Sequence, residues 1–183
     1  MSCEENYPLI KEIVFIDPPA YYDQKYQKDK FDSNGKKITH IRFYLTGNLF
    51  YSDRTSYHIT SKIVYETKKE LYPHLEGLPE LEKMRLEFEY HSMKDIDLDN
   101  KASFWVKIML DILKTPTARQ LARASKEKKP KPIITTNTIK DDNTKCIDEI
   151  KLKFRKGEHK MIFRIYGKVK DEQKKLDLFF VND

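Results

Sequence analysis

Hydrophobic and polar residues alternate with a period of two in several parts of the chain. In residues 84–90, apolar or aromatic side chains occupy every second position and charged residues fill the places between them. This period is typical of a half-buried β-strand. Shorter alternating segments and one apolar run predict four further strands, at residues 13–16, 41–45, 150–154 and 161–165.

Two other segments place their apolar residues at helical spacing. Residues 56–72 have one apolar side and are followed by Pro73, which predicts a helix that ends at this proline. Residues 102–113 are apolar around most of the helical circumference, which predicts a largely buried helix. The tyrosine-rich stretch after Pro19 contains Asn34-Gly35 and is predicted to be a loop or hairpin turn.

The order of these elements predicts an α+β fold. We expect a single two-layer domain over residues 1–183, with a mixed β-sheet packed against two main helices. Residues 1–50 would supply N-terminal strands or an extension, and residues 114–140 a basic loop insertion. Gly157 predicts a hairpin between the last two alternating strands, and the apolar run 176–181 predicts an edge strand or a packed tail.

The composition agrees with one folded domain. Of the 183 residues, 39% are hydrophobic and 12% aromatic, which is enough for a substantial core. The chain has no run of about 18 apolar residues, and Glu4 and Glu5 stand where a signal peptide would be apolar. We therefore expect a cytoplasmic protein with no membrane partner, in which Cys3 and Cys146 are reduced thiols.

The positive charge is concentrated in one segment. The chain carries 35 Lys and Arg against 29 Asp and Glu, a net charge of +6. Residues 114–140 hold eight basic residues and one acidic residue, or +7, so the rest of the chain is nearly neutral. Pro130 and Pro132 predict a loop there, which either contacts phosphate groups or simply stays solvated. The candidates for nucleic-acid contact in and near this segment are Lys101, Lys114, Arg119, Arg123, Lys126, Lys128, Lys129 and Lys131.

Three aspartates alternate just before the second predicted helix. Asp95, Asp97 and Asp99 point to one side if the preceding strand continues through them. Carboxylates packed so closely repel one another and are tolerated most easily around a divalent cation. The other interpretation is an Asp-rich loop that caps the helix, with Asp99 or Asn100 at the N-cap.

A second acidic pair, Asp141-Asp142, stands just before the strand predicted at residues 150–154. Because each acidic cluster lies at the end of an element, the two are candidates to converge on one metal ion. Lys107 and Asp111 lie four residues apart on the helix between them. They form either a surface ion pair or a site in which the ammonium group faces a metal-bound phosphate.

Together these motifs resemble the RusA-like Holliday junction resolvases over roughly residues 84 to 166. The motifs are D-x-D-N at residues 97–100, K-x-x-x-D-x-L at residues 107–113, and the D-D pair ahead of a strand. In that family the lysine follows the D-N pair by three residues, whereas Lys107 follows Asn100 by seven, so Lys101 is a competing candidate. The interval from Asp111 to Asp141 is also longer than the family pattern and holds the whole basic segment.

The resemblance implies a Mg²⁺-dependent endodeoxyribonuclease. Such an enzyme resolves four-way DNA junctions by paired phosphodiester hydrolysis in recombination and repair, as a homodimer without a small-molecule cofactor. It assigns Asp97, Asp99 and Asp142 as metal-binding and catalytic carboxylates, and Lys107 as the catalytic lysine. Whether Asp95, Asp111 or Asp141 also joins the site stays open.

Other functions fit the sequence less well. The main alternative is a non-catalytic, structure-selective DNA-binding protein on the same scaffold, and an interaction protein with an acidic partner ranks lower. Glu149-Ile150-Lys151 matches the E-x-K element of another nuclease class, but its charged residues fall on the solvent-facing side of the predicted strand. The five histidines have no ligand spacing, which gives a zinc site little support.

Overall fold

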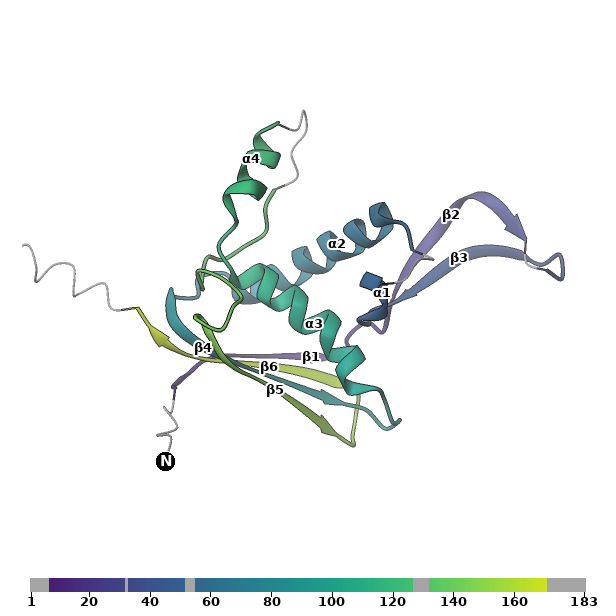
Figure 1. Ribbon diagram of the computed structural model, residues 1–183. Coiled ribbons are helices and arrows are strands. Elements are labelled where there is room, and N and C mark those ends of the chain that lie inside the picture. Colours follow the sequence, from purple (N-terminus) through teal and green to yellow (C-terminus); the bar gives the residue numbers. More distant parts are fainter. Residues whose placement is uncertain (1–6, 32, 52–54, 127–131, 171–183) are drawn as a thin grey trace, which may run out of the picture.

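A four-stranded sheet with helices packed on one of its faces forms the body of the molecule (Figure 1). The computed structural model describes residues 7–31, 33–51, 55–126 and 132–170. The α+β class, the mixed sheet and the two main helices are as predicted. The elements are β1 (Leu9–Ile16), β2 (Tyr21–Phe31), β3 (Lys37–Tyr44), α1 (Asn48–Tyr51), α2 (Tyr57–Leu75), β4 (Leu81–His91), α3 (Leu98–Leu113), α4 (Ala118–Lys126), β5 (Ile147–Arg155) and β6 (Lys160–Val169).

The four strands of the sheet follow the spatial order β1-β6-β4-β5. β4 pairs parallel with β5, and β6 pairs antiparallel with both β4 and β1. The prediction of a hairpin at Gly157 is therefore wrong, because β4 lies between β5 and β6. The four residues 156–159 cross two strand spacings, about 10 Å, which so short a link can span.

A separate two-stranded ribbon precedes the helices. β2 and β3 pair antiparallel and extend away from the four-stranded sheet (Figure 1). The turn at Asn34-Gly35 is confirmed, and Gly35 has the positive φ of 74° that glycine tolerates best. The tyrosine-rich stretch before it is strand β2, which pairs with β3 on both sides of a register shift between Lys25 and Lys30.

The two main helices begin at clear N-caps. The Ser56 hydroxyl accepts a hydrogen bond from the backbone N–H of Ile59 at the start of α2, and Asp97 does the same for Asn100 at the start of α3. Pro73 lies inside the last turn of α2 and does not end the helix as predicted. Only two helical residues follow the proline, so the helix ends within a turn of it, and the proline itself removes one backbone N–H donor.

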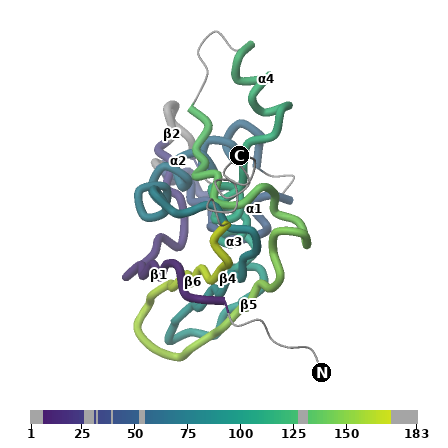
Figure 2. Tube along the Cα trace, turned by 90° about the vertical axis from the view of Figure 1, so that its left-hand side faces the viewer, coloured from purple at the N-terminus to yellow at the C-terminus, as the bar shows by residue number. Residues whose placement is uncertain are grey.

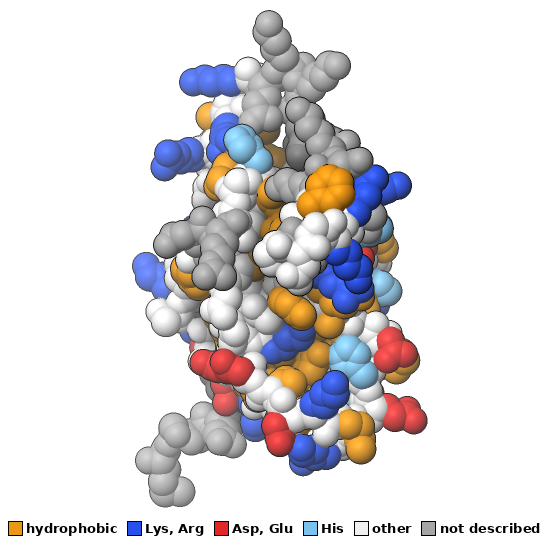
Figure 3. All heavy atoms as spheres, turned by 90° about the vertical axis from the view of Figure 1, so that its right-hand side faces the viewer, with side chains coloured by type: hydrophobic (Ala, Val, Ile, Leu, Met, Phe, Trp, Pro, Cys, Tyr) orange, Lys and Arg blue, Asp and Glu red, His pale blue; other side chains and the backbone are white. Residues whose placement is uncertain are grey.

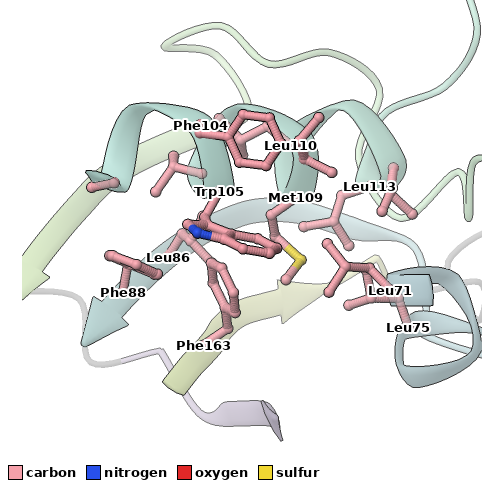
Figure 4. Packing of buried hydrophobic residues seen from close by; sticks show 14 of the residues in the cluster. Leu71, Leu75, Leu86, Phe88, Phe104, Trp105, Met109, Leu110, Leu113 and Phe163 are labelled. Atoms are coloured by element: carbon pink, nitrogen blue, oxygen red, sulfur yellow. The ribbon is translucent and has the colours of Figure 1, made fainter. Parts of the chain in front are cut away.

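The hydrophobic core lies between α3, α2 and the sheet (Figure 4). Trp105 and Met109 of α3 point toward Leu86 and Phe88 of β4 and Phe163 of β6, and all five side chains are almost fully buried. Burying each such side chain stabilises the fold by roughly 1.5–3 kcal/mol. α3 is therefore held firmly over the middle of the sheet, which fixes the positions of both its ends.

The basic segment is not loop throughout. Its first part contains α4, which projects from the side of the helix layer away from the sheet in both views (Figures 1 and 2). No helix in the described ranges is long and apolar enough to span a membrane. Cys3 and the apolar run 176–181 lie outside the described residues.

Candidate metal centre and nucleic-acid surface

Asp97 and Asp99 lie together at the start of α3. Asp97 is the N-cap residue, and Asp99 stands in the first turn. The prediction that this segment caps the helix is confirmed, but the N-cap residue is Asp97 and not Asp99 or Asn100. The segment is anchored by Asn100, whose backbone carbonyl accepts from Gly47 N–H at 2.7 Å and whose side-chain oxygen accepts from Asn48 N–H at 3.1 Å.

The two carboxyl groups interact directly with each other. The contact with Asp99 raises the pKa of Asp97, and the same contact lowers the pKa of Asp99. Both side chains are exposed, so solvent and ions reach them. Two carboxyl groups held this close repel each other when both are ionised, and a bound cation relieves that repulsion.

Asp95 does not belong to this pair. β4 ends at His91, so the strand does not continue through the three aspartates as the alternation predicted. The Asp95 carboxylate instead contacts the ammonium group of Lys156, in the link between β5 and β6. Figure 3 views the end of the molecule where α3 begins, and acidic side chains gather in the lower half of this face with basic ones among them.

Asp142 lies at the other end of α3. Its carboxylate contacts the ammonium group of Lys114, the C-cap residue of the helix, at 2.9 Å. Lys114 is the main reason that the pKa of Asp142 is lowered. The neighbouring Asp141 closes the local turn, since its carboxylate accepts from Asp142 N–H and from the Asn143 side chain, both at 2.9 Å.

The two acidic clusters therefore do not converge within one chain. α3 has 16 residues, which corresponds to about 24 Å between its ends. A divalent ion needs its oxygen ligands within about 2.6 Å, so Asp97 and Asp99 cannot share an ion with Asp142 of the same chain. The described ranges contain no group of three or more His, Cys, Asp or Glu side chains suited to a metal ion.

Lys107 stands near the middle of α3, beside neither cluster. Its ammonium group is exposed and lies 5.8 Å from the centre of the Phe50 ring. The competing candidate, Lys101, is one helical turn from the carboxyl pair. Burial lowers the pKa of Lys101, whose ammonium group lies 5.7 Å from the centre of the Tyr90 ring. Lys101 is therefore the lysine nearer to Asp97 and Asp99.

Asp111 pairs with lysines other than the predicted Lys107. Its carboxylate contacts Lys68 of α2 at 3.2 Å and Lys114 at 2.9 Å. Burial opposes its charge, but Lys68 and Lys114 still hold the pKa of Asp111 below its usual range. Lys114 thus bridges Asp111 and Asp142 with only 17% of its side chain exposed, and it is not available as the phosphate contact predicted for it.

α4 carries the exposed part of the basic segment. Arg119, Arg123 and Lys126 recur at the spacing that places them on one side of the helix. Thr117 and Gln120 form a capping box, with Gln120 N–H donating to the Thr117 hydroxyl at 3.3 Å and Thr117 N–H donating to the Gln120 carboxamide at 2.8 Å. This Thr-x-x-Gln pattern is the sequence signal that would have predicted α4. The candidates Lys128, Lys129 and Lys131 lie outside the described residues.

The sheet face opposite the helices carries an ion-pair network that the sequence did not indicate. Arg164 of β6 contacts Glu87 at 2.5 Å and Glu89 at 2.7 Å, both on β4. Lys153 of β5 also contacts Glu87, at 2.6 Å. Glu149 and Lys151 are exposed on the same face, as predicted. Every described acid of this network has a basic partner, so the network stabilises the sheet and leaves no open set of carboxylates.

The arrangement offers two exposed half-sites and one basic helix. The carboxyl pair at the start of α3 can accept a cation, Asp142 at the far end can supply a further ligand, and α4 can contact phosphate groups. Comparison of the chain with models of known protein families, with curated proteins and with solved structures finds no match.

Proposed function

We propose that the protein is a Mg²⁺-dependent endonuclease of four-way DNA junctions that acts as a homodimer with shared metal sites. In each site, Asp97 and Asp99 of one protomer would act together with the partner's Asp142. The observation that carries this proposal is the position of the two half-sites at opposite ends of α3. The expected single-chain site does not fit a metal ion, and two chains are needed to complete one.

Two-fold symmetry supplies the missing half of each site. An axis perpendicular to α3 reverses the direction of the helix, so that the start of one copy lies at the level of the end of the other. The same operation creates two equivalent sites in one dimer. A four-way junction needs two symmetric incisions for resolution, so two sites related by a two-fold axis match the substrate.

The residues of the chain have defined tasks in this scheme. Mg²⁺ bound by carboxylates activates a water molecule and stabilises the leaving oxygen in phosphodiester hydrolysis. Asp97 and Asp99 hold their oxygens close together and would supply two carboxylate ligands to the cation. Lys101 lies one helical turn from the same carboxyl pair, nearer than Lys107, which favours it over Lys107 as the lysine that faces the phosphate.

α4 would bind the DNA backbone. Its three basic side chains lie on one side of a helix that stands clear of the body, and phosphate contacts of this kind require no base sequence. Recognition through the backbone suits a junction, which differs from duplex DNA in shape.

A non-catalytic DNA-binding protein is the second candidate function. One observation favours it: within the described part of a single chain, no three His, Cys, Asp or Glu side chains form a group that could hold a metal ion. In that case α4 would bind junctions, while the two acidic clusters would only cap and anchor α3. Metal-dependent cleavage separates the two candidates.

A mixing experiment with two inactive variants tests the shared site. We would purify heterodimers of Asp99→Asn and Asp142→Asn protomers carrying different affinity tags, and measure nicking of a synthetic four-way junction with MgCl₂. In a shared arrangement, one of the two sites receives both intact residues, so the heterodimer nicks one strand although each homodimer is inactive. Sites confined to single chains would leave the heterodimer inactive.

The reverse mixture is the matched control. A heterodimer of the wild-type chain with an Asp99→Asn/Asp142→Asn chain loses both shared sites and is inactive, whereas single-chain sites would leave one active. If the wild-type homodimer binds the junction but cuts it with neither Mg²⁺ nor Mn²⁺, the nuclease proposal is rejected and the binding protein remains.

A further inference from the structure

β5 is an edge strand with an exposed apolar side. It pairs with β4 on one side, and no other described strand pairs with it on the other. Ile150 is 42% exposed and Leu152 39% exposed. A nine-residue edge of this kind offers free backbone groups to another strand, and proteins normally cover or pair it.

The two faces of β5 differ in character. Ile150 and Leu152 are in register with Leu86 and Phe88 of β4, so they lie on the side of the sheet that the helices cover. α3 approaches both β4 and β5, yet it leaves the Ile150 and Leu152 side chains partly exposed. The opposite face of β5 carries charged residues of both signs, namely Glu149, Lys151, Lys153 and Arg155.

We propose that β5 pairs antiparallel with β5 of a second copy of this chain, with Lys151 at the two-fold axis. The two four-stranded sheets then form one sheet of eight strands. This inference rests on the homodimer of the proposed function and names the surface through which that homodimer forms.

The pairing of apolar with apolar and of acidic with basic side chains favours this register. With Lys151 at the axis, Ile150 lies opposite the partner's Leu152 on the helix face, and Glu149 lies opposite the partner's Lys153 on the charged face, each pair occurring twice. Lys153 already contacts Glu87 of its own chain, so the partner's Glu149 would join an existing ion pair.

Neighbouring registers fit less well. Directly opposite residues must share a face, so the axis moves by whole residues along β5. An axis at Ile150 pairs Ile150 only with itself, so it gives one apolar pair on the helix face where the Lys151 register gives two. An axis at Leu152 places Lys151 opposite Lys153 twice. In the Lys151 register, the one like-charge pair is Lys151 with itself, and the partner's Glu149 lies diagonally from each of these lysines.

The other edge of the sheet offers no such register. β1 carries exposed Val14 and Ile16, but its opposite charges, Lys11 and Glu12, stand on different faces. They cannot lie opposite each other in a symmetric antiparallel pair. The pairing of β1 is also interrupted between Leu9 and Lys11, where its register with β6 shifts.

The proposed interface is continuous with the half-sites. In this register the partner's Ile147 lies opposite Arg155, so the partner's residues before Ile147 run past the end of β5. That end of the sheet lies beside the start of α3, because Ser92 N–H donates to the Arg155 carbonyl and Lys156 contacts Asp95. The partner's Asp142 is thereby carried toward Asp97 and Asp99.

Disulfide formation at the axis tests the interface without DNA or metal. In a Cys3→Ser/Cys146→Ser background, Lys151→Cys brings two thiols to directly opposite positions, and mild oxidation should give a dimer on a non-reducing gel. Lys153→Cys is the matched control, since its two copies would be about 13 Å apart. Stronger cross-linking of Ile150→Cys than of Lys151→Cys, or no cross-linking at Lys151→Cys, would overturn the proposed register.

Sedimentation of surface variants gives a second measurement. Leu152→Lys replaces a partly exposed side chain, so the chain should stay folded by circular dichroism and sediment as a monomer. Glu149→Lys should raise the dimer dissociation constant about tenfold, because two attractive pairs become repulsive. A wild-type monomer, or a folded Leu152→Lys variant that remains dimeric, would overturn the inference.

The outcome for the interface can be separated from the outcome for the nuclease. A protein that cuts junctions but does not cross-link through Lys151→Cys keeps the proposed function and loses this interface. A protein that cross-links there but never cuts keeps the interface and loses the nuclease.

Discussion

Asp97 has two tasks at the scale of a single residue. Its side chain caps α3 by accepting from Asn100 N–H at 3.4 Å, and its carboxyl group also contacts Asp99. Capping needs only an oxygen acceptor, whereas cation binding needs a negative charge. Substitutions that preserve one property and remove the other therefore separate structure from function.

Asp97→Ala should lower the free energy of unfolding by about 1 kcal/mol, because the α3 N-cap is lost. Asp97→Asn keeps an acceptor oxygen and should unfold within about 0.5 kcal/mol of the wild type, while junction cleavage is abolished. Urea denaturation and a cleavage assay on both variants provide the measurements. A cleaving Asp97→Asn variant would remove Asp97 from the metal site.

Arg164 is the residue on which the charged sheet face depends. Arg164→Met should destabilise the fold by about 2–3 kcal/mol near pH 7, because Glu87 and Glu89 are largely buried and lose their shared cation. Burial opposes ionisation of both acids, yet Lys153, Arg164 and His91 hold their pKa values below the usual range. This stabilisation exists above the unfolded-state pKa, about 4.3, and is lost as pH falls below it.

The difference in stability between Arg164→Met and the wild type should therefore shrink below about pH 4. Denaturation at pH 7 and at pH 3.5 measures it. Lys168→Met is the control, since Lys168 and Glu82 form an exposed pair at 3.4 Å whose loss should cost less than about 1 kcal/mol. A constant difference across this pH range would show that the network does not act through the two glutamates.

At the scale of elements, the structure turns the basic segment from a loop into a projecting helix. Its charge matters for binding only if phosphate groups reach α4, and the response to salt measures this directly. Each phosphate contact that is lost lowers the slope of log affinity against log salt by about 0.9.

The triple variant Arg119→Gln/Arg123→Gln/Lys126→Gln should bind a junction more weakly and reduce the salt slope by up to about 2.7. A fluorescence-anisotropy titration at several salt concentrations gives both quantities. The matched control replaces Lys11, Lys62 and Lys145, which are exposed on other parts of the molecule, by glutamine. Equal effects of the two triple variants would mean that α4 has no special role.

The sequence predicted local elements better than their partners. β4 and α3 were evident because burial imposes a period of two on one and a nearly continuous apolar surface on the other. Gly157 indicated a turn, but no local pattern indicates that β4 lies between the strands it joins. α4 was not predicted, because Pro130, Pro132 and the repeated lysines indicate a loop for the whole basic segment. Only the capping box at Thr117 indicates a helix.

In the candidate site, too, the sequence predicted the local structure but not the tertiary contacts. The start of α3 was located correctly, because Asp97, Asp99 and Asn100 carry a local signal that the cap geometry confirms. The expectation that Asp142 joins them in one chain was wrong, because the two acidic clusters lie at opposite ends of the 16-residue helix α3. The partners of Asp111 also depended on tertiary contacts, since Lys68 comes from α2.

At the scale of the whole molecule, one fold presents two half-sites and an open sheet edge at β5. Neither feature explains a function within a single chain, but a two-fold axis at β5 would account for both. Dimerisation would then be a condition for catalysis, so activity should fall steeply when the protein is diluted below its dimer dissociation constant. A rate per protomer that is independent of dilution, measured across the concentration at which sedimentation shows dissociation, would contradict this.

The position of β6 has a consequence for how the protein is made. β6 follows every other described element along the chain, yet it lies between β1 and β4 and pairs Leu9 with Tyr166. During synthesis the sheet therefore has a gap at its centre until β6 leaves the ribosome, and such non-local pairing is slow to form. The sheet should therefore fold only after β6 has left the ribosome, and copies should not associate through β5 before that point.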